Sequence, residues 1–396
     1  MSMRCHFILL TPASYYDFFA STLNTTVGSN FNLKNIALPL GISFYTFQQI
    51  GFLVDSYTGK QEKSSFVEYA LFVTFFPQLV AGPIVKYSEV IPQFRKETSC
   101  RIDWNNLSWG FIILSFGLAK KVLLADTLAL GVNWYWSNLE SASGLDTVFA
   151  MLMYTLEIYF DFSGYCDMAY GMALILNIEL PINFNKPYIA TSITDFWSRW
   201  HMTLTRFLRE YIYIPLGGNR KGKLRTYLNV MIVFLVSGLW HGANWTFVLW
   251  GGMHGTAQVI ERAFKKSLGK IPKIVTGVVT FLFVNLAWML FRAPTITDAC
   301  VAYTKFFEGS WTVSSNMLLN YYIVEFIPLQ HTLFRSNPYL YSMITVIVIG
   351  LVFSFFFKPV IQKQGKIVPR LYVAGALFIW SVINLSVGGT FIYFNF

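Results

Sequence analysis

The sequence has few charged residues. Asp, Glu, Lys and Arg make up only 13% of its 396 residues, whereas about 25% is usual in soluble domains. Hydrophobic residues account for 55% of the chain and aromatic residues for 18%. This composition excludes an ordinary soluble globular domain and predicts a protein embedded in a lipid bilayer.

Acidic residues are scarcer than basic ones, at 20 against 30, so the formal net charge is +10. A basic protein of this kind is often a nucleic-acid binder. Here, however, the Lys and Arg residues lie in short connections between apolar runs, where positive charge marks the cytoplasmic side of a membrane protein. We therefore expect the bilayer as a partner and no nucleic acid.

Cysteines are few and unpatterned. Cys5, Cys100, Cys166 and Cys300 show no C-x-x-C spacing, so neither a disulfide framework nor a metal or redox site is expected. The N-terminus has no small-residue cleavage site, which argues against a signal peptide. No internal repeat is visible, and this favours one integrated domain.

Long apolar runs, in contrast, are abundant. Runs of about 18 or more residues are long enough to span a bilayer as helices. They predict an all-α, polytopic membrane protein with about eight to ten transmembrane helices. The runs are residues 37–58, 64–85, 107–131, 144–165, 226–241, 244–261, 271–292, 340–358 and 367–388.

One polar segment, residues 183–226, interrupts this pattern. It holds eight Lys and Arg residues against only Asp195 and Glu210, so we predict a cytoplasmic interfacial segment. A second basic group follows at 262–273. Residues 226–261 must then leave the cytoplasm and return to it, which predicts a helical hairpin.

Within this segment, DFWSRWHMTLTRFLRE has helical periodicity from Asp195 onwards. We predict one amphipathic helix, capped by Thr194 or Asp195, that ends before 215–218 and lies at or dips into the interface. His201 falls on its apolar arc. A histidine in such a place is commonly structural, so a structural and a catalytic role both stay open. The arc comprises Trp197, Trp200, His201, Leu204, Leu208 and Tyr211.

A second histidine, His241, lies in SGLWHGANWTFVLWGGMHG near the expected apex of the hairpin. Ionisable residues inside the membrane are rare and generally functional. The small flanking residues 242–244 would leave room for a substrate. The alternative is that Trp240, Trp245 and Trp250 only pack or anchor the hairpin.

The stretch GGNRKGK at 217–223 is similar to a phosphate-binding loop, but Leu224 stands where Ser or Thr is needed to bind magnesium. It also follows a helix rather than a strand, so nucleotide hydrolysis is not expected. Asn219 and Arg220 remain candidates for binding the phosphates of an anionic donor.

Three carboxylates, Glu157, Asp161 and Asp167, interrupt another apolar stretch. Because a charge facing lipid is costly, we expect them to point into the bundle. They would form a polar network between helices or take part directly in chemistry.

Two such histidines suit acyl transfer. A neutral imidazole can remove a proton from a hydroxyl as its oxygen attacks an acyl carbonyl. We expect His201 near the cytoplasm and His241 deep in the bilayer, which fits a donor from inside and an acceptor outside.

Several segments together resemble the membrane-bound O-acyltransferase superfamily, with the alginate O-acetyltransferase-like branch the most similar. The resemblance runs from about Leu38 to the C-terminus, so 37–396 is expected to be the transmembrane domain and 1–36 a divergent N-terminus. The segments are FPQLVAGPIVKY, DFSGYCDMA, PINFNKPY, DFWSRWHMTLTRFLREYIYIPLGGNRKG, LWHGANWTFVLWGGMHG and WMLFRAP.

The resemblance implies catalytic roles for His241 and His201, with acetyl-coenzyme A as acyl donor and no bound cofactor or metal. It implies an extracytoplasmic polysaccharide as acceptor, an SGNH-type partner protein and a location in the inner or plasma membrane. Candidates for the substrate or donor channel are Trp197, Arg199, Trp200, Asn219, Arg220, Trp240 and Asn244.

Family members usually have further spans before the segment that matches ALPLGISFYTFQQ, so we expect a truncated chain or a late initiation codon. Two alternatives remain open. One is a D-alanyl transferase of the same superfamily, supplied by a carrier protein. The other is a glycan or lipid transporter with a proton relay, although no inverted repeat is visible.

Overall fold

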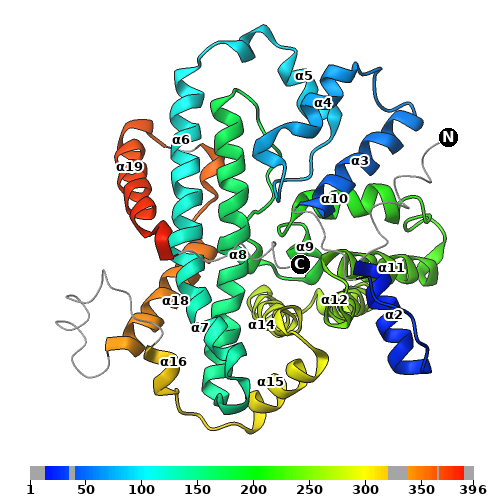
Figure 1. The fold of residues 1–396 in the computed structure, drawn as a ribbon, viewed down its shortest axis with the longest axis vertical. Helices are drawn as coiled ribbons and strands as arrows, with labels where there is room; N and C mark the ends of the chain where they lie inside the picture. The colour runs from blue at the N-terminus through cyan, green and yellow to red at the C-terminus, as the bar shows by residue number, and fades with distance from the viewer. Residues whose placement is uncertain (1–13, 35–40, 320–337, 364, 388–396) are drawn as a thin grey trace.

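The computed structural model describes residues 14–34, 41–319, 338–363 and 365–387, and within these residues it contains helices and no strands (Figure 1). The predicted all-α fold is confirmed. The expected boundary between residues 36 and 37 lies outside the described residues. The principal helices are α2 Ser14–Val27, α3 Ile42–Tyr57, α6 Trp104–Ala119, α7 Asp126–Ser137, α8 Gly144–Ile175, α11 Gly222–His241, α12 Trp245–Ala263, α14 Lys273–Arg292, α15 Ile296–Glu308, α18 Pro338–Phe356 and α19 Ile367–Ile383.

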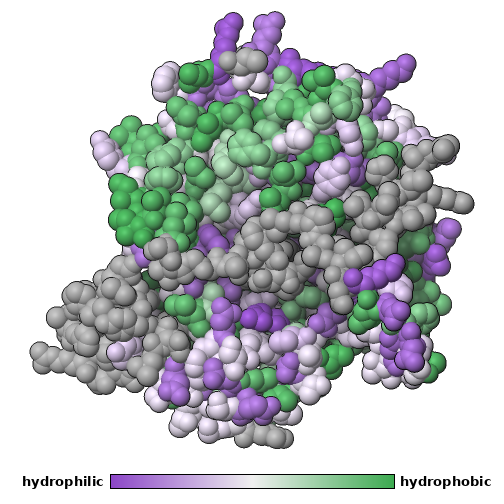
Figure 2. Space-filling view, in the orientation of Figure 1, coloured by the Kyte–Doolittle hydropathy of each residue, from purple (hydrophilic) through white to green (hydrophobic). Residues whose placement is uncertain are grey.

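Four helical stretches in the described part of the chain are long and apolar enough to cross a bilayer: Trp104–Ser137, Gly222–His241, Lys273–Arg292 and Tyr339–Gln362. Others among the expected spans are helices that are shorter or contain more polar residues, such as α3 and α8. Figure 2 shows hydrophobic residues gathered over the upper half and left flank of the molecule, with hydrophilic side chains towards the top and bottom edges.

The run predicted to span at 64–85 does not form a spanning helix. It forms the short helix α4, Phe66–Thr74, and then a 3-10 turn, Phe76–Gln78. Pro77 explains the interruption, because a proline removes a backbone donor and disfavours a helical conformation in the residue before it. Nine residues of helix rise only about 13 Å, which is too short to cross the hydrocarbon core.

The central element is a pair of long helices, α8 and the rod formed by α6 and α7, which lie side by side in Figure 1. Glycines allow this close approach. A Cβ atom added to Gly117 would lie 2.7 Å from the carbonyl oxygen of Gly164, and one on Gly171 would lie 2.7 Å from that of Gly110. Small residues commonly line helix contacts in membranes in this way. A π-helical turn, Lys120–Ala125, joins α6 to α7.

The predicted hairpin is confirmed as a structure. Helices α11 and α12 pack against each other and are joined by a short turn at 242–244. A Cβ on Gly238 would lie 2.2 Å from the carbonyl oxygen of Phe247, and one on Gly251 would lie 2.3 Å from that of Phe234. The two helix backbones therefore touch, and α14 packs against α12.

The single helix predicted over 195–210 is wrong in one respect. The segment forms two short helices, α9 Ile193–Trp197 and α10 Met202–Leu208, and continues as a π-helical turn, Arg209–Tyr213. Ser192, rather than Thr194 or Asp195, caps α9. The chain breaks at 198–201, where His201 adopts a left-handed conformation with φ 44°. The sequence pattern shows the apolar face but not this break.

Helix α2 packs against the apex of the hairpin. The Tyr15 hydroxyl donates to the carbonyl oxygen of Leu239 at 3.0 Å, and the Trp245 indole N–H donates to Thr22 Oγ1 at 3.2 Å. Helix α2 is therefore part of the same packed unit, which composition alone did not indicate.

Candidate active site: two histidines beside Trp240

His241 is the last residue of α11, at the apex of the hairpin, and its side chain is buried. Aromatic rings surround it, with centroids 4.7 Å away for Trp240, 5.2 Å for Trp250 and 5.1 Å for Phe291. The space expected beside the apex is filled. Gly242 admits the Phe247 ring, since a Cβ there would lie 2.5 Å from the Phe247 Cε2 atom.

His201 is fully buried, and a loop residue, Asn183, holds its imidazole ring. Asn183 Oδ1 lies 3.2 Å from His201 Nδ1 and accepts hydrogen bonds from the backbone N–H and the hydroxyl of Thr203 at 3.1 and 3.0 Å. A backbone N–H can only donate, so the atom that it contacts is the amide oxygen. His201 Nδ1 must therefore donate a proton to that oxygen.

This bond determines the tautomer of His201. With the proton on Nδ1, Nε2 of a neutral imidazole carries a lone pair. His201 Nε2 is buried and has no hydrogen-bond partner among the described residues. Burial, with a smaller contribution from His241, lowers the pKa of His201 well below its ordinary value. The ring is therefore neutral at physiological pH and presents a base.

Two backbone hydrogen bonds hold this geometry. Asn185 N–H donates to the carbonyl oxygen of Arg199 at 2.9 Å, and Met202 N–H donates to that of Asn183 at 3.0 Å. Segment 183–185 is thus hydrogen-bonded to the backbone on both sides of His201. These bonds compensate for the unfavourable left-handed conformation of that residue.

The Trp240 ring lies beside both histidines, at centroid distances of 6.2 Å from His201 and 4.7 Å from His241. Sequence analysis placed one histidine near the cytoplasm and the other deep in the bilayer. The structure brings the two rings closer together than this expectation implies: the break before α10 carries His201 into the bundle, where both rings pack against one indole.

A third histidine, His254 on α12, was not predicted. The Trp197 indole N–H donates to His254 Nδ1 at 3.2 Å, so the proton of the neutral ring must be on Nε2. His254 is fully buried within an aromatic cluster. Its tautomer is the opposite of that of His201, so His254 offers a proton donor and not a base.

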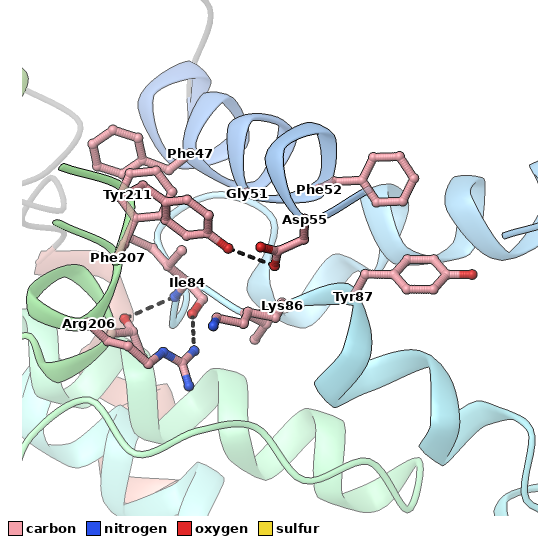
Figure 3. Close-up of a pocket in the computed structure, with 12 residues that line it drawn as sticks. Phe47, Gly51, Phe52, Asp55, Ile84, Lys86, Tyr87, Arg206, Phe207 and Tyr211 are labelled. Carbon is pink, nitrogen blue, oxygen red and sulfur yellow. Dashed lines mark hydrogen bonds between the residues drawn. The ribbon is translucent and has the colours of Figure 1, made fainter. Parts of the chain in front are cut away.

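A narrow, partly open pocket lies beside this site (Figure 3). Phe47, one of its walls, stacks on Trp240 at 4.9 Å and on Phe207 at 4.2 Å. Thr203, another wall, bonds Asn183. Two pocket residues, Phe47 and Thr203, therefore contact Trp240 and Asn183, the neighbours of the His201 ring. It is lined by Phe47, Gly51, Phe52, Asp55, Ile84, Val85, Lys86, Tyr87, Thr203, Arg206, Phe207 and Tyr211.

The polar part of the pocket consists of paired groups. Lys86 forms an ion pair with Glu210, and Arg206 forms one with Glu89. Figure 3 shows Tyr211 pointing towards Asp55, to which its hydroxyl donates at 2.7 Å. These residues come from α3, from α5 (Tyr87–Phe94) and the loop before it, and from the polar segment, so residues far apart in sequence build one entrance.

Some predicted channel residues have other contacts. Trp200 packs in the core against Trp288, and Arg199 pairs with Asp195 at 2.7 Å. Asn244 caps α12 and donates to the carbonyl oxygen of Pro294 at 2.8 Å.

Asn219 and Arg220 lie exposed in the turn before α11. The contacts of the described residues do not bring either of them to the histidines. Of the predicted channel residues, only Trp240 lies directly beside both histidines, while Trp197 contacts the neighbouring His254.

The three intramembrane carboxylates are buried inside the bundle, as predicted. Asp161 pairs with Lys121 and Asp167 with Lys120, each at 2.6 Å, across the contact between α8 and the π-helical turn. Glu157 Oε2 has no hydrogen-bond partner among the described residues. The ion pairs support a network between helices rather than direct chemistry.

No three His, Cys, Asp or Glu side chains in the described ranges come together as a metal site requires. The chemistry available at the site is that of an imidazole base, aromatic walls and unpartnered N–H donors.

Comparison with known proteins places this geometry in context. Residues 52–296 match the model of MBOAT, the membrane-bound O-acyltransferase family. The chain is 45% identical over 320 residues to a peptidoglycan O-acetyltransferase of Helicobacter pylori, covering 74% of this chain and 61% of that protein. It is 40% identical over 309 residues to a probable alginate O-acetylase AlgI of Azotobacter vinelandii, covering 76% and 61%.

A more distant relative is a teichoic acid D-alanyltransferase of Streptococcus thermophilus, 30% identical over 245 residues, which cover 58% of this chain and 59% of that protein. The chain thus spans about three fifths of the length of the curated relatives it matches. Because the matched model covers more than half of the sequence, the chain belongs to the membrane-bound O-acyltransferase family.

Proposed function

We propose that this multi-pass membrane protein transfers an acetyl group from acetyl-coenzyme A to hydroxyl groups of a cell-envelope polysaccharide. The observation that carries the proposal is the buried Nε2 lone pair of His201, oriented by Asn183, on a ring that shares the neighbour Trp240 with His241. The family and the names of the relatives supply the reaction class.

The chemistry follows from the neutral imidazole. A histidine base removes the hydroxyl proton while the oxygen attacks the acetyl carbonyl carbon. The bond between carbonyl carbon and sulfur then breaks, and the proton passes to the thiolate that leaves. No nucleophilic Ser or Cys is needed, because the acceptor hydroxyl is itself the nucleophile.

The pocket in Figure 3 is the proposed donor entrance. Its walls of Phe47, Phe52 and Phe207 suit the narrow arm that carries the thioester. At its rim, Lys86 and Arg206, which pair with Glu210 and Glu89 in this structure, would exchange those partners for the anionic remainder of the donor. By the positive-inside rule this rim belongs to the cytoplasmic side.

The acceptor is proposed to be an extracytoplasmic glycan, since the named acetyltransferase relatives act on peptidoglycan or alginate. An SGNH-type partner that completes the transfer outside the membrane, and a location in the inner or plasma membrane, belong to the same proposal. Both ends of the α11–α12 hairpin are then cytoplasmic, and its apex faces the acceptor.

Donor competition tests this function. Purified protein with its partner is given labelled acetyl-coenzyme A or a D-alanyl carrier protein, and label in the glycan is counted. We expect transfer from acetyl-coenzyme A, since identity is higher to the acetyltransferases than to the D-alanyltransferases. Transfer of D-alanine alone would refute acetyl transfer and identify a D-alanyl transferase instead.

A further inference from the structure

We propose that the indole N–H of Trp240 is a catalytic group that donates a hydrogen bond to the carbonyl oxygen of the acyl group as negative charge develops on it. This inference rests on the proposed acyl transfer and identifies the donor that the two histidines do not supply. It assigns to Trp240 a role in the reaction and not only in lining a channel.

The first observation is that this N–H is unpartnered. Trp240 Nε1 is buried and has no hydrogen-bond partner among the described residues. A buried donor left without an acceptor costs about 1–3 kcal/mol, so proteins rarely retain one. When such a donor lies in an active site, a reacting oxygen that it binds is a direct explanation.

The second observation is the position of the ring. Trp240 packs against both histidines and stacks on Phe47, which lines the pocket. An acyl group entering along Phe47 reaches Trp240 first. The indole is also partly exposed, unlike the histidines on either side of it.

The third observation is complementarity with His201. His201 Nε2 is an unpartnered acceptor and Trp240 Nε1 an unpartnered donor, and their rings lie 6.2 Å apart. A hydroxyl that attacks an acyl carbonyl presents the matching groups: an O–H to donate to His201 and a carbonyl oxygen to accept from Trp240. Such a pair satisfies both nitrogens at once.

Trp250 has the same kind of unpartnered N–H but a different location. It is fully buried, stacks on Trp288 at 5.7 Å and contacts His254 as well as His241. Neither indole lines the pocket, but Trp240 stacks on the pocket residue Phe47, whereas the rings that Trp250 contacts all lie outside the pocket lining. Trp136, on α7, has a further unpartnered N–H, packs below Arg292 and makes no ring contact with a described histidine. Trp136 therefore provides a matched control.

In the reaction, the carbonyl carbon becomes tetrahedral as the new bond to the hydroxyl oxygen forms. The electron pair of the C=O double bond moves to the carbonyl oxygen, where the Trp240 N–H stabilises it. When the carbonyl forms again, the C–S bond breaks and the thiolate takes the proton held by the histidine. The indole keeps its own proton throughout.

The test is the substitution Trp240→Phe, which keeps a ring that stacks on Phe47 and removes only the donor. Acetyl transfer is measured in the full chain with its partner, at varied acetyl-coenzyme A concentrations and normalised to folded protein. Loss of one such donor lowers kcat by about 10²–10³-fold. We expect a fall of about 10²-fold in kcat, little change in KM and normal abundance.

Trp136→Phe is the control and should retain parental kcat. Parental kcat in Trp240→Phe would overturn the assignment, as would a loss confined to abundance or KM. If the parent protein itself transfers no acetyl group from acetyl-coenzyme A, that result would instead refute the proposed function on which this inference rests.

Discussion

Replacement of Asn183 by Leu separates the role of this residue in folding from its role at the site. Its Oδ1 atom accepts hydrogen bonds from His201 Nδ1 and from the backbone N–H and hydroxyl of Thr203. The hydroxyl can rotate to another acceptor, whereas the Thr203 backbone N–H cannot, and the neutral His201 ring keeps one buried N–H without an acceptor in either tautomer. At about 1–3 kcal/mol for each buried unsatisfied donor, Asn183→Leu should lower the free energy of unfolding by about 2–6 kcal/mol.

The effect on activity has a different origin. Without Asn183, the neutral imidazole of His201 can place its proton on Nε2, and the ring can turn away from the reacting hydroxyl. Misplacement of a catalytic group by about 1 Å can reduce a rate by about 10²-fold. We expect acetyl transfer per folded molecule to fall by roughly 10- to 100-fold.

Asn285→Leu is the matched control. Asn285 is equally buried, accepts from Thr155 Oγ1 and donates to the carbonyl oxygen of Phe281, both at 2.7 Å. It should lower the thermal midpoint in detergent but leave activity per folded molecule unchanged. Full activity per folded Asn183→Leu molecule, or an equal loss in Asn285→Leu, would refute the assignment of the His201 tautomer.

Three further predictions follow from burial and packing. Because folding lowers the pKa of His201, the unfolded chain takes up a proton below about pH 6.5 that the folded protein does not. The free energy of unfolding should therefore fall as the pH drops through that value, and it should fall less in His201→Gln. An equal dependence of the unfolding free energy on pH in both proteins, measured by chemical denaturation, would contradict this. Lys120→Met should cost about 3–5 kcal/mol because it leaves the Asp167 charge buried and unpaired, and the double variant Lys120→Met/Asp167→Asn should recover most of the loss in thermal melts. Gly117→Val should lower the unfolding free energy by about 2 kcal/mol or more, since no space exists for its Cβ, and an unchanged melting midpoint would show that the helices are not in contact there.

The sequence was sufficient to predict the helical membrane fold because long apolar runs and the clustering of basic residues have direct physical causes. It also predicted the hairpin and the burial of Asp161 and Asp167. It did not predict the break at 198–201, because a left-handed residue other than glycine is stabilised by tertiary hydrogen bonds that leave no local pattern.

The site was only half predictable for the same reason. His201, His241 and Trp240 stood out because polar or indole groups in apolar surroundings are unusual. Asn183 lies in a loop 18 residues before His201, and nothing in PINFN indicates which side chain its amide meets. His254 contacts Trp197, which lies 57 residues before it in the sequence, so no local pattern indicates their hydrogen bond.

The central claim, that His201 and His241 act in one acyl-transfer step, is tested most directly by a double-mutant cycle. Acetyl transfer from labelled acetyl-coenzyme A is measured per folded molecule for His201→Gln, His241→Gln and the double variant. Loss of a general base costs about 10²–10⁴-fold, and residues that act as one unit are strongly non-additive. We predict that each single variant loses at least about 10²-fold and that the double variant is no slower than the slower single one. Parental activity in either single variant, or losses that multiply in the double variant, would contradict the account.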